Sequence, residues 1–149
     1  MEVKKILCAV DLEDTIAPSV EYAKMMASMT GASILVAYVI PAHTPAEDVY
    51  LSVNNQPNEV NNPNETIQKS MNALLAEQFA GMDATGVILV GRPSEELVKL
   101  AEEKGANLIV MGTHGRAGFD RLLFGSVAHE VVRAAPCPVM TVRPLMPKK

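Results

Sequence analysis

Apolar residues along the chain gather in five short runs that are bounded by polar residues, glycine or proline. Short, nearly continuous apolar runs are typical of strands that are buried on both faces of a sheet. The runs cover residues 4–11, 33–40, 87–90, 107–113 and 138–143. The pattern therefore predicts five buried strands.

Between these runs, apolar residues recur at the three- and four-residue spacing of amphipathic helices. Capping residues and glycines indicate where each helix begins and ends. The first helix is predicted with Asp14 or Thr15 as its cap, Pro18 in its first turn and Gly31 at its end; the second begins at Asn64 or Thr66 and ends near Gly81; the third is capped by Ser94 and ends at Gly105; the fourth covers residues 126–135.

Strands that alternate with helices predict an α/β fold, a doubly wound parallel sheet with helices on both faces. The chain has 149 residues, the length of one domain, so residues 1–149 are predicted to form a single domain. Ligands of such sheets bind outside the carboxyl ends of the strands, where the strand order changes direction. Asp11, Val39 and the loop after Gly112 follow or end predicted strands, and we expect them to converge there.

The segment 41–64 is rich in proline and asparagine and lacks the apolar residues that a core element needs. It is predicted to be a long, mobile surface loop. A linker between two domains is the alternative, but neither flank is long enough to form an independent α/β domain.

Composition and charge limit the classes of binding partner that the chain is expected to have. The chain is 48% hydrophobic and 20% charged, which is ordinary for a globular protein, and its net charge is -4. Nucleic acids and acidic membranes attract basic surfaces, so neither is an expected partner. The N-terminus lacks the apolar region of a signal peptide, and no apolar run is long enough to cross a bilayer. A cytoplasmic location is predicted.

The cysteines and histidines do not have the spacing of a structural metal site. Cys8 lies within a predicted strand and Cys137 between two prolines, so both are interpreted as small buried hydrophobic residues. His129-Glu130 matches half of a zinc-protease motif, but Arg133 stands where the second histidine would be.

The most informative motif is a glycine pattern, G-x-x-G-x9-G-S, formed by Gly112, Gly115, Gly125 and Ser126. Glycine permits positive φ and lets backbone N–H groups approach a ligand closely, and the first N–H groups of a helix are unpaired and positively polarised. The pattern follows a buried strand and precedes a helix, so it favours a phosphate-binding loop. The alternative is a loop in which the glycines only permit turns.

With this motif, the strand sequences KKILCAVD and GASILVAYVI and the ending APCPVMTVR, the chain resembles the universal stress proteins, in particular their ATP-binding branch. The resemblance covers nearly the whole chain. It implies the strand order 3-2-1-4-5, a homodimer, and ATP held between the ends of the first, second and fourth strands. The implied nucleotide contacts are Ala9, Val10, Asp11, Val39, Met111, Gly112, His114, Gly115, Arg116, Gly125, Ser126 and Val127.

The resemblance also implies a role for each group of residues. Asp11 would face the nucleoside and sugar, the backbone of Val39 would contact adenine, and Met111 and Gly112 would flank the ribose and phosphates. Five residues of the glycine loop and the start of the last helix would surround the triphosphate, namely His114, Gly115, Gly125, Ser126 and Val127. The chain differs from the family after Asp11, where Leu12-Glu13-Asp14 replaces a small hydroxyl-bearing turn. Acids repel a triphosphate unless a cation intervenes, so Mg²⁺ or Mn²⁺ is expected with ATP.

The motif favours a nucleotide-binding regulatory protein, and the resemblance implies a stress-response protein that binds ATP and hydrolyses it weakly at most. No G-x-x-x-x-G-K-[ST] motif occurs, and Arg116 and Arg121 are the only cations that the glycine loop offers to phosphates. The alternatives are a phosphohydrolase or nucleotidyl-transfer enzyme in which Asp11 holds a metal ion, and a structural dimer with an empty site. A flavodoxin-like carrier is disfavoured because the loop after the first strand is acidic.

The last strand, residues 138–143, would lie at the edge of a sheet with the implied order. An exposed edge strand presents unpaired N–H and C=O groups that proteins cover, charge or pair. Pro138 and Pro144 limit the length of this strand, which suits pairing with a twin strand across a two-fold axis. The homodimer is therefore expected to form through the last strand. The alternative is an edge that a neighbouring loop protects.

Overall fold

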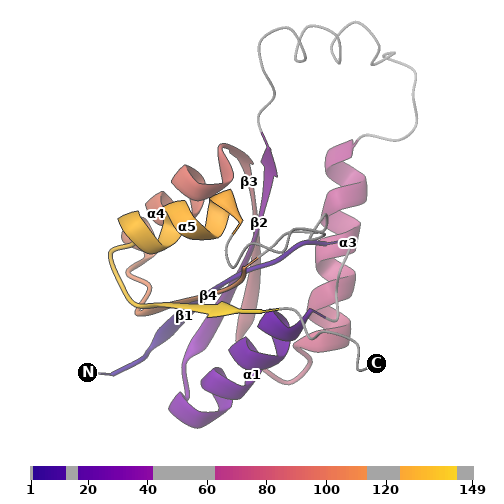
Figure 1. Cartoon of the computed structure of the whole chain (residues 1–149). Coiled ribbons are helices and arrows are strands. Elements are labelled where there is room, and N and C mark those ends of the chain that lie inside the picture. The colour runs from indigo at the N-terminus through magenta and orange to yellow at the C-terminus, as the bar shows by residue number, and fades with distance from the viewer. Residues whose placement is uncertain (1, 13–16, 42–62, 114–124, 144–149) are drawn as a thin grey trace, which may run out of the picture.

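The computed structural model describes residues 2–12, 17–41, 63–113 and 125–143, which form a parallel sheet with helices on both faces (Figure 1). The elements in chain order are β1 (Lys5–Ala9), α1 (Pro18–Thr30), β2 (Ser33–Pro41), α3 (Pro63–Gln78), β3 (Ala84–Gly91), α4 (Pro93–Lys104), β4 (Leu108–Gly112), α5 (Ser126–Ala134) and β5 (Val139–Val142). The five strands have the order β3-β2-β1-β4-β5. This confirms the predicted fold class and strand order.

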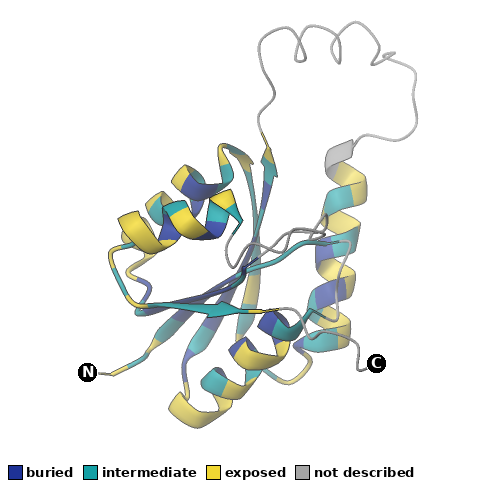
Figure 2. Cartoon of the chain, viewed as in Figure 1, coloured by how far each residue is buried: buried dark blue, intermediate teal, exposed yellow. Residues whose placement is uncertain are grey.

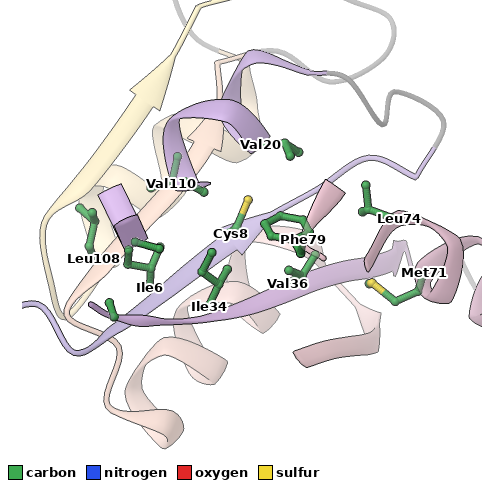
Figure 3. Packing of buried hydrophobic residues seen from close by; sticks show 13 residues of the cluster. Ile6, Cys8, Val20, Ile34, Val36, Met71, Leu74, Phe79, Leu108 and Val110 are labelled. Carbon is green, nitrogen blue, oxygen red and sulfur yellow. The ribbon is translucent and has the colours of Figure 1, made fainter. Parts of the chain in front are cut away.

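The sheet separates two hydrophobic layers because successive side chains of a strand point to opposite faces. In β1, Ile6 and Cys8 belong to the layer beneath α1 and α3 (Figures 1 and 3). Leu7 belongs to the layer beneath α4 and α5. All three side chains are fully buried. The burial colouring in Figure 2 shows the same arrangement, with buried residues along the central strands and exposed residues on the outer faces of the helices. The central strand is therefore covered on both sides, as its apolar run predicted.

Proline begins three of the helices, and this shifts their starts from the predicted positions. The residue before α1 is Ala17, so the predicted cap at Asp14 or Thr15 is wrong. Helix α3 begins at Pro63 instead of Asn64 or Thr66. Proline suits the first helical position because the N–H that it lacks would have no partner in the helix there.

Ser94 does not cap α4, which corrects a further prediction. The N-cap position is Arg92, whose side chain makes no capping hydrogen bond, and Pro93 follows it. Ser94 instead lies inside the helix, and its hydroxyl donates a hydrogen bond to Glu130 of α5. The helix ends were predicted correctly for α1 and α4, because Gly31 and Gly105 adopt the left-handed conformation that glycine favours.

Strand limits differ from the predictions mainly in β3. This strand extends from Ala84 to Gly91, whereas only its apolar part, residues 87–90, was predicted. Its first half includes Gly86, where an added Cβ would lie 2.6 Å from Cγ of Met71 on α3. The strand therefore continues through a glycine because the packing helix leaves no space for a side chain.

The cysteines are both free. Cys8 is fully buried, as predicted, and burial raises the pKa of its thiol to about 12. Cys137 is only half-buried, and the same cause raises its pKa. In the described part of the chain, no helix has the length and apolar character that crossing a membrane requires. The predicted loop at 41–64 lies outside the described residues, apart from Pro41 and the first two residues of α3.

Candidate functional site

The central strand β1 stops before its neighbours do at the carboxyl edge of the sheet. Pairing between β1 and β2 ends at Ala9–Ala37, whereas β2 remains paired with β3 as far as Pro41–Gly91. On the other side, β1 is paired with β4 only to Cys8–Val110, although β4 continues beside β5 to Gly112. We call the region beyond Ala9, where β2 and β4 extend past the paired part of β1, the ladder gap.

The backbone of Val39 is directed toward the ladder gap. In a parallel ladder, the N–H and C=O groups of alternate residues point to opposite neighbouring strands. Ala37 accepts a hydrogen bond from the N–H of Val10 at 2.9 Å, so odd-numbered residues of β2 face β1. The even-numbered Ile34 donates to Asp83 before β3, at 2.8 Å. The N–H and C=O of Val39 therefore face the side of β2 on which the pairing with β1 has ended.

Gly112 approaches the ladder gap from the opposite side. The N–H groups of Ile109 and Thr113 donate to Pro138 and Val142 of the β5 segment, each at 3.0 Å. Odd-numbered residues at the end of β4 therefore face β5. By alternation, the backbone groups of Gly112 face β1. The ladder gap is thus bordered by main-chain donors and acceptors from both neighbouring strands.

The predicted side chains near the ladder gap divide between the two layers of the protein. Ala9, Val39, Met111 and Val127 belong to the layer of α4 and α5, whereas Val10 packs in the layer of α1 and α3. Val39 and Met111 are 8% and 4% exposed, so they offer a ligand their backbones and little of their side chains. Asp11 follows directly and is half-buried.

The N-terminus of α5 completes the described part of the site. Gly125 occupies the N-cap position and has no side chain with which to cap the helix. Its N–H donates to the carbonyl of Thr113 at 2.6 Å, which places the start of α5 beside the end of β4. Ser126, the first helical residue, is exposed, and Val127 is half-buried. The first N–H groups of α5 therefore carry the positive end of the helix dipole at this edge.

Gly112 and Gly125 do not have the positive φ that the sequence motif suggested. Gly125 has φ -74°, a conformation that any residue adopts, and Gly112 lies within strand β4. Positive φ therefore does not explain either glycine. What remains is the absence of a Cβ, which lets another group approach the backbone closely.

Several predicted contacts lie outside the described residues, namely His114, Gly115 and Arg116, together with Arg121 and the acids Glu13 and Asp14. The structure therefore brings together Ala9, Val10, Asp11, Val39, Met111, Gly112, Gly125, Ser126 and Val127 at one edge of the sheet. Among the described residues, no group of three or more His, Cys, Asp or Glu side chains could hold a metal ion.

The sequence analysis did not predict two features on the side of the sheet that carries α4 and α5. Thr113 is 3% exposed, and its hydroxyl has no hydrogen-bond partner within the described part of the chain. The sequence feature that could have indicated Thr113 was its position between Gly112 and Gly115, the first two glycines of the motif. The second feature is a groove of about 320 Å³ between α4 and α5. It is lined by Ser94, Glu95, Val98, Lys99, Glu102, Glu130 and Ala134, none of which was a predicted site residue.

Glu130 is the polar residue that connects the walls of this groove. Its carboxylate accepts hydrogen bonds from the hydroxyl of Ser94 and, at 3.3 Å, from the Arg92 guanidinium. The hydrogen bond from Ser94, followed by the charge of Arg92, outweighs partial desolvation and lowers the pKa of Glu130. Ser94 and Glu130 are 36 positions apart, so no local motif predicts their pairing.

The chain has a doubly wound α/β fold, and proteins of this class bind ligands at the carboxyl ends of their strands. The chain matches the Universal stress protein family over residues 2–143. It therefore belongs to the universal stress protein family.

Individual relatives agree with this assignment. Universal stress protein MJ0577 of Methanocaldococcus jannaschii is 28% identical to the chain over 94% of each sequence. The structure of MJ0577 superposes with a TM-score of 0.78 at 25% identity, covering 99% of this chain and 100% of that one. MJ0531 of the same organism is 47% identical over 75 residues, which are 50% of this chain and 42% of that protein.

One relative carries a nucleotide. The universal stress protein from Archaeoglobus fulgidus in complex with dAMP has a TM-score of 0.57 at 25% identity, covering 95% of this chain and 98% of that one. Nucleotide binding therefore occurs within the family.

Proposed function

We propose that this chain is a cytoplasmic regulatory protein of the stress response that binds ATP at the ladder gap. The observation that carries the proposal is the position of three main-chain elements around the end of β1. Val39 and Gly112 direct their backbone groups toward the gap from β2 and β4, and the uncapped N-terminus of α5 lies beside the end of β4.

The backbone of Val39 suits an adenine base. A base read through its Watson–Crick edge needs hydrogen-bond partners fixed in position. Adenine offers an amino donor beside a ring-nitrogen acceptor, and the C=O and N–H of one strand residue can pair with both. Since this contact uses the main chain, it does not depend on the buried valine side chain. The adenine base of dAMP in the Archaeoglobus relative supports the same ligand class.

The N-terminus of α5 suits the phosphates. Unpaired N–H groups and the helix dipole favour an anion at this position. Gly125 has no Cβ to obstruct the approach, and the exposed Ser126 adds a hydroxyl. In the proposed complex, His114, Gly115 and Arg116 complete the phosphate contacts. Asp11 follows β1 beside the gap and would hold Mg²⁺ or Mn²⁺ together with phosphate oxygens, as carboxylates commonly do for these cations.

Regulation is favoured over efficient catalysis because the described strand ends offer few groups for chemistry. Ala9, Val39 and Met111 are apolar, and among the described residues that border the ladder gap Asp11 is the one with an ionisable side chain. Phosphoryl transfer depends on cations that stabilise the developing charge and on a group that positions the nucleophile. ATP hydrolysis is therefore expected to be weak at most.

A homodimer through β5 is the second part of the proposal. The strand lies at the edge of the sheet. The carbonyls of Pro138 and Val142 accept hydrogen bonds from the β4 segment, so by alternation the backbone groups of Val139 and Thr141 point outward. A second copy of β5 would pair with these outward groups.

Calorimetric titration of ATP into the wild type, Gly125→Val and Ala134→Val tests the nucleotide site. The valine side chain at position 125 places bulk at the start of α5, and binding should be lost. Ala134 is exposed at the other end of the same helix, so its variant is the matched control and should bind ATP as the wild type does. A wild type that does not bind ATP overturns the function, and unchanged affinity in Gly125→Val overturns the position of the site.

A further inference from the structure

Thr113 carries a buried hydroxyl that the fold itself does not satisfy. The residue is 3% exposed, and its Oγ1 has no hydrogen-bond partner among the residues that the structure describes. Most buried polar side-chain atoms in proteins are hydrogen-bonded, because leaving one unpaired destabilises the folded state. The unpaired hydroxyl therefore indicates a function that outweighs its effect on stability.

The backbone of Thr113 is held between β5 and α5. Its N–H donates to Val142 at 3.0 Å, and its C=O accepts the hydrogen bond from Gly125 at 2.6 Å. Ile109 and Met111, two and four residues earlier, point their side chains into the layer of α4 and α5. Thr113 continues this alternation, since its N–H faces β5 as that of Ile109 does. Its side chain is thus directed to the face of the sheet on which α5 begins.

The helix that begins there is not capped by its own N-cap residue. Helix α5 contains nine residues, and in the described part of the chain its N-cap residue, Gly125, has no side chain to accept a hydrogen bond from the first N–H groups. An unpaired hydroxyl and uncapped N–H groups are both hydrogen-bond donors, and both lie at the junction of Thr113 and Gly125. Several donors that converge in this way suit an anionic oxygen, for which each hydrogen bond is stronger than one to a neutral acceptor.

We propose that the Thr113 hydroxyl donates a hydrogen bond to a phosphate oxygen of the bound nucleotide. This inference rests on the proposed nucleotide function and adds a side-chain contact to a site otherwise formed largely by backbone. Valine has nearly the shape of threonine without the hydroxyl. Thr113→Val therefore removes the donor for phosphate and, at the same time, the unpaired polar group of the protein without nucleotide. Loss of the donor weakens ATP binding, whereas loss of the unpaired polar group stabilises the protein without nucleotide.

The experiment compares Thr113→Val, Thr113→Ser and Thr30→Val with the wild type, by calorimetric titration with ATP and by thermal unfolding without nucleotide. Thr113→Val should bind ATP roughly 10- to 100-fold more weakly, the loss expected for a hydrogen bond to a charged group. Its unfolding temperature without ATP should equal or exceed that of the wild type. Thr113→Ser keeps the hydroxyl and should bind ATP within about threefold of the wild type, a change of roughly 0.7 kcal/mol.

Thr30→Val is the matched control. The Thr30 hydroxyl donates to the carbonyl of Met26 at 2.7 Å and accepts from the N–H of Ala32 at 3.2 Å, at the end of α1. The same substitution there should lower the unfolding temperature and leave the ATP affinity unchanged, the reverse of the expected result at position 113.

Two outcomes would overturn this inference alone. If the wild type binds ATP and Thr113→Val binds it equally well, the hydroxyl does not contact the phosphate. If Thr113→Val unfolds at a lower temperature than the wild type without ATP, the hydroxyl already has a structural partner such as a buried water. A wild type that does not bind ATP overturns the proposed function together with this contact.

Discussion

The hydroxyl of Ser94 near the start of α4 donates a hydrogen bond to the carboxylate of Glu130 in the middle of α5. Ser94 is 4% exposed, so this bond lies between the two helices and not on their outer surfaces. The Arg92 guanidinium adds an ion pair to Glu130 at 3.3 Å and a second to Glu95 at 3.5 Å. Helix α5 also supplies Gly125 and Ser126 to the candidate site, so this contact helps to position the proposed phosphate-binding end of the helix.

Loss of the Ser94 hydroxyl should destabilise the protein. Ser94→Ala leaves the carboxylate of Glu130 without its buried donor, and the free energy of unfolding should fall by about 1 kcal/mol, as for one ordinary hydrogen bond. Urea denaturation measures the change. Ser33→Ala is a suitable control because the Ser33 hydroxyl makes only a long hydrogen bond, 3.4 Å, to Lys4. Equal losses in both variants would contradict a specific contribution from the contact with Glu130.

The contribution of Glu130 should depend on pH. The Ser94 hydrogen bond, with the charge of Arg92, holds the pKa of this carboxyl below its ordinary value of 4.5. A pKa that is lowered on folding adds stability above the ordinary value, and this stability is lost as the pH falls through the lower, folded-state pKa. Glu130→Gln cannot ionise. Its free energy of unfolding should lie below that of the wild type at neutral pH, and the difference should shrink as the pH falls below 4.5. A constant difference between neutral and acidic pH would exclude this linkage.

In the proposed homodimer, the N–H groups of neighbouring β5 residues have different partners. By alternation, the N–H of Thr141 points away from the sheet, whereas that of Val142 points toward β4. Thr141→Pro should therefore produce a folded monomer, because proline removes an outward donor. Val142→Pro is the comparison and should lower the free energy of unfolding instead, since it removes a donor within the sheet.

Sedimentation velocity at micromolar concentration, together with urea denaturation of each variant, measures both effects. A monomeric wild type would exclude the dimer. A Thr141→Pro variant that stays fully dimeric would show that β5 is not the interface.

Removal of divalent cations should weaken ATP binding, because Asp11 and the triphosphate repel each other without a cation between them. Calorimetry with Mg²⁺ and with excess chelator measures this difference. In Asp11→Asn the repulsion is absent, and the difference between the two conditions should become smaller. Asp83→Asn, in an exposed residue before β3 at the opposite edge of the sheet, should retain the full difference. Equal affinity of the wild type in both conditions would argue against a bound cation.

Local patterns predicted the number and kind of elements because burial and backbone conformation act over a few residues. The apolar runs around Ile6 and Val110 mark strands that are covered on both faces, and both side chains are fully buried. Gly31 and Gly105 were predicted to end their helices, and both adopt left-handed φ. The helix starts were less predictable. A proline at the first position competes with nearby Asp, Thr or Ser residues as the starting signal, and proline prevailed in α1 and α4.

The sequence by itself determined an α/β chain with a glycine motif after its fourth strand, and the family resemblance supplied the strand order. Tertiary structure alone decided where the central strand stops relative to its neighbours, and hence which backbone groups border the ladder gap. Register between β1, β2 and β4 depends on how three distant segments pack, so no local pattern shows that Val39 faces the gap. The same reason applies to the unpaired hydroxyl of Thr113 and to the hydrogen bond between Ser94 and Glu130, since each depends on where α5 lies against the sheet and α4.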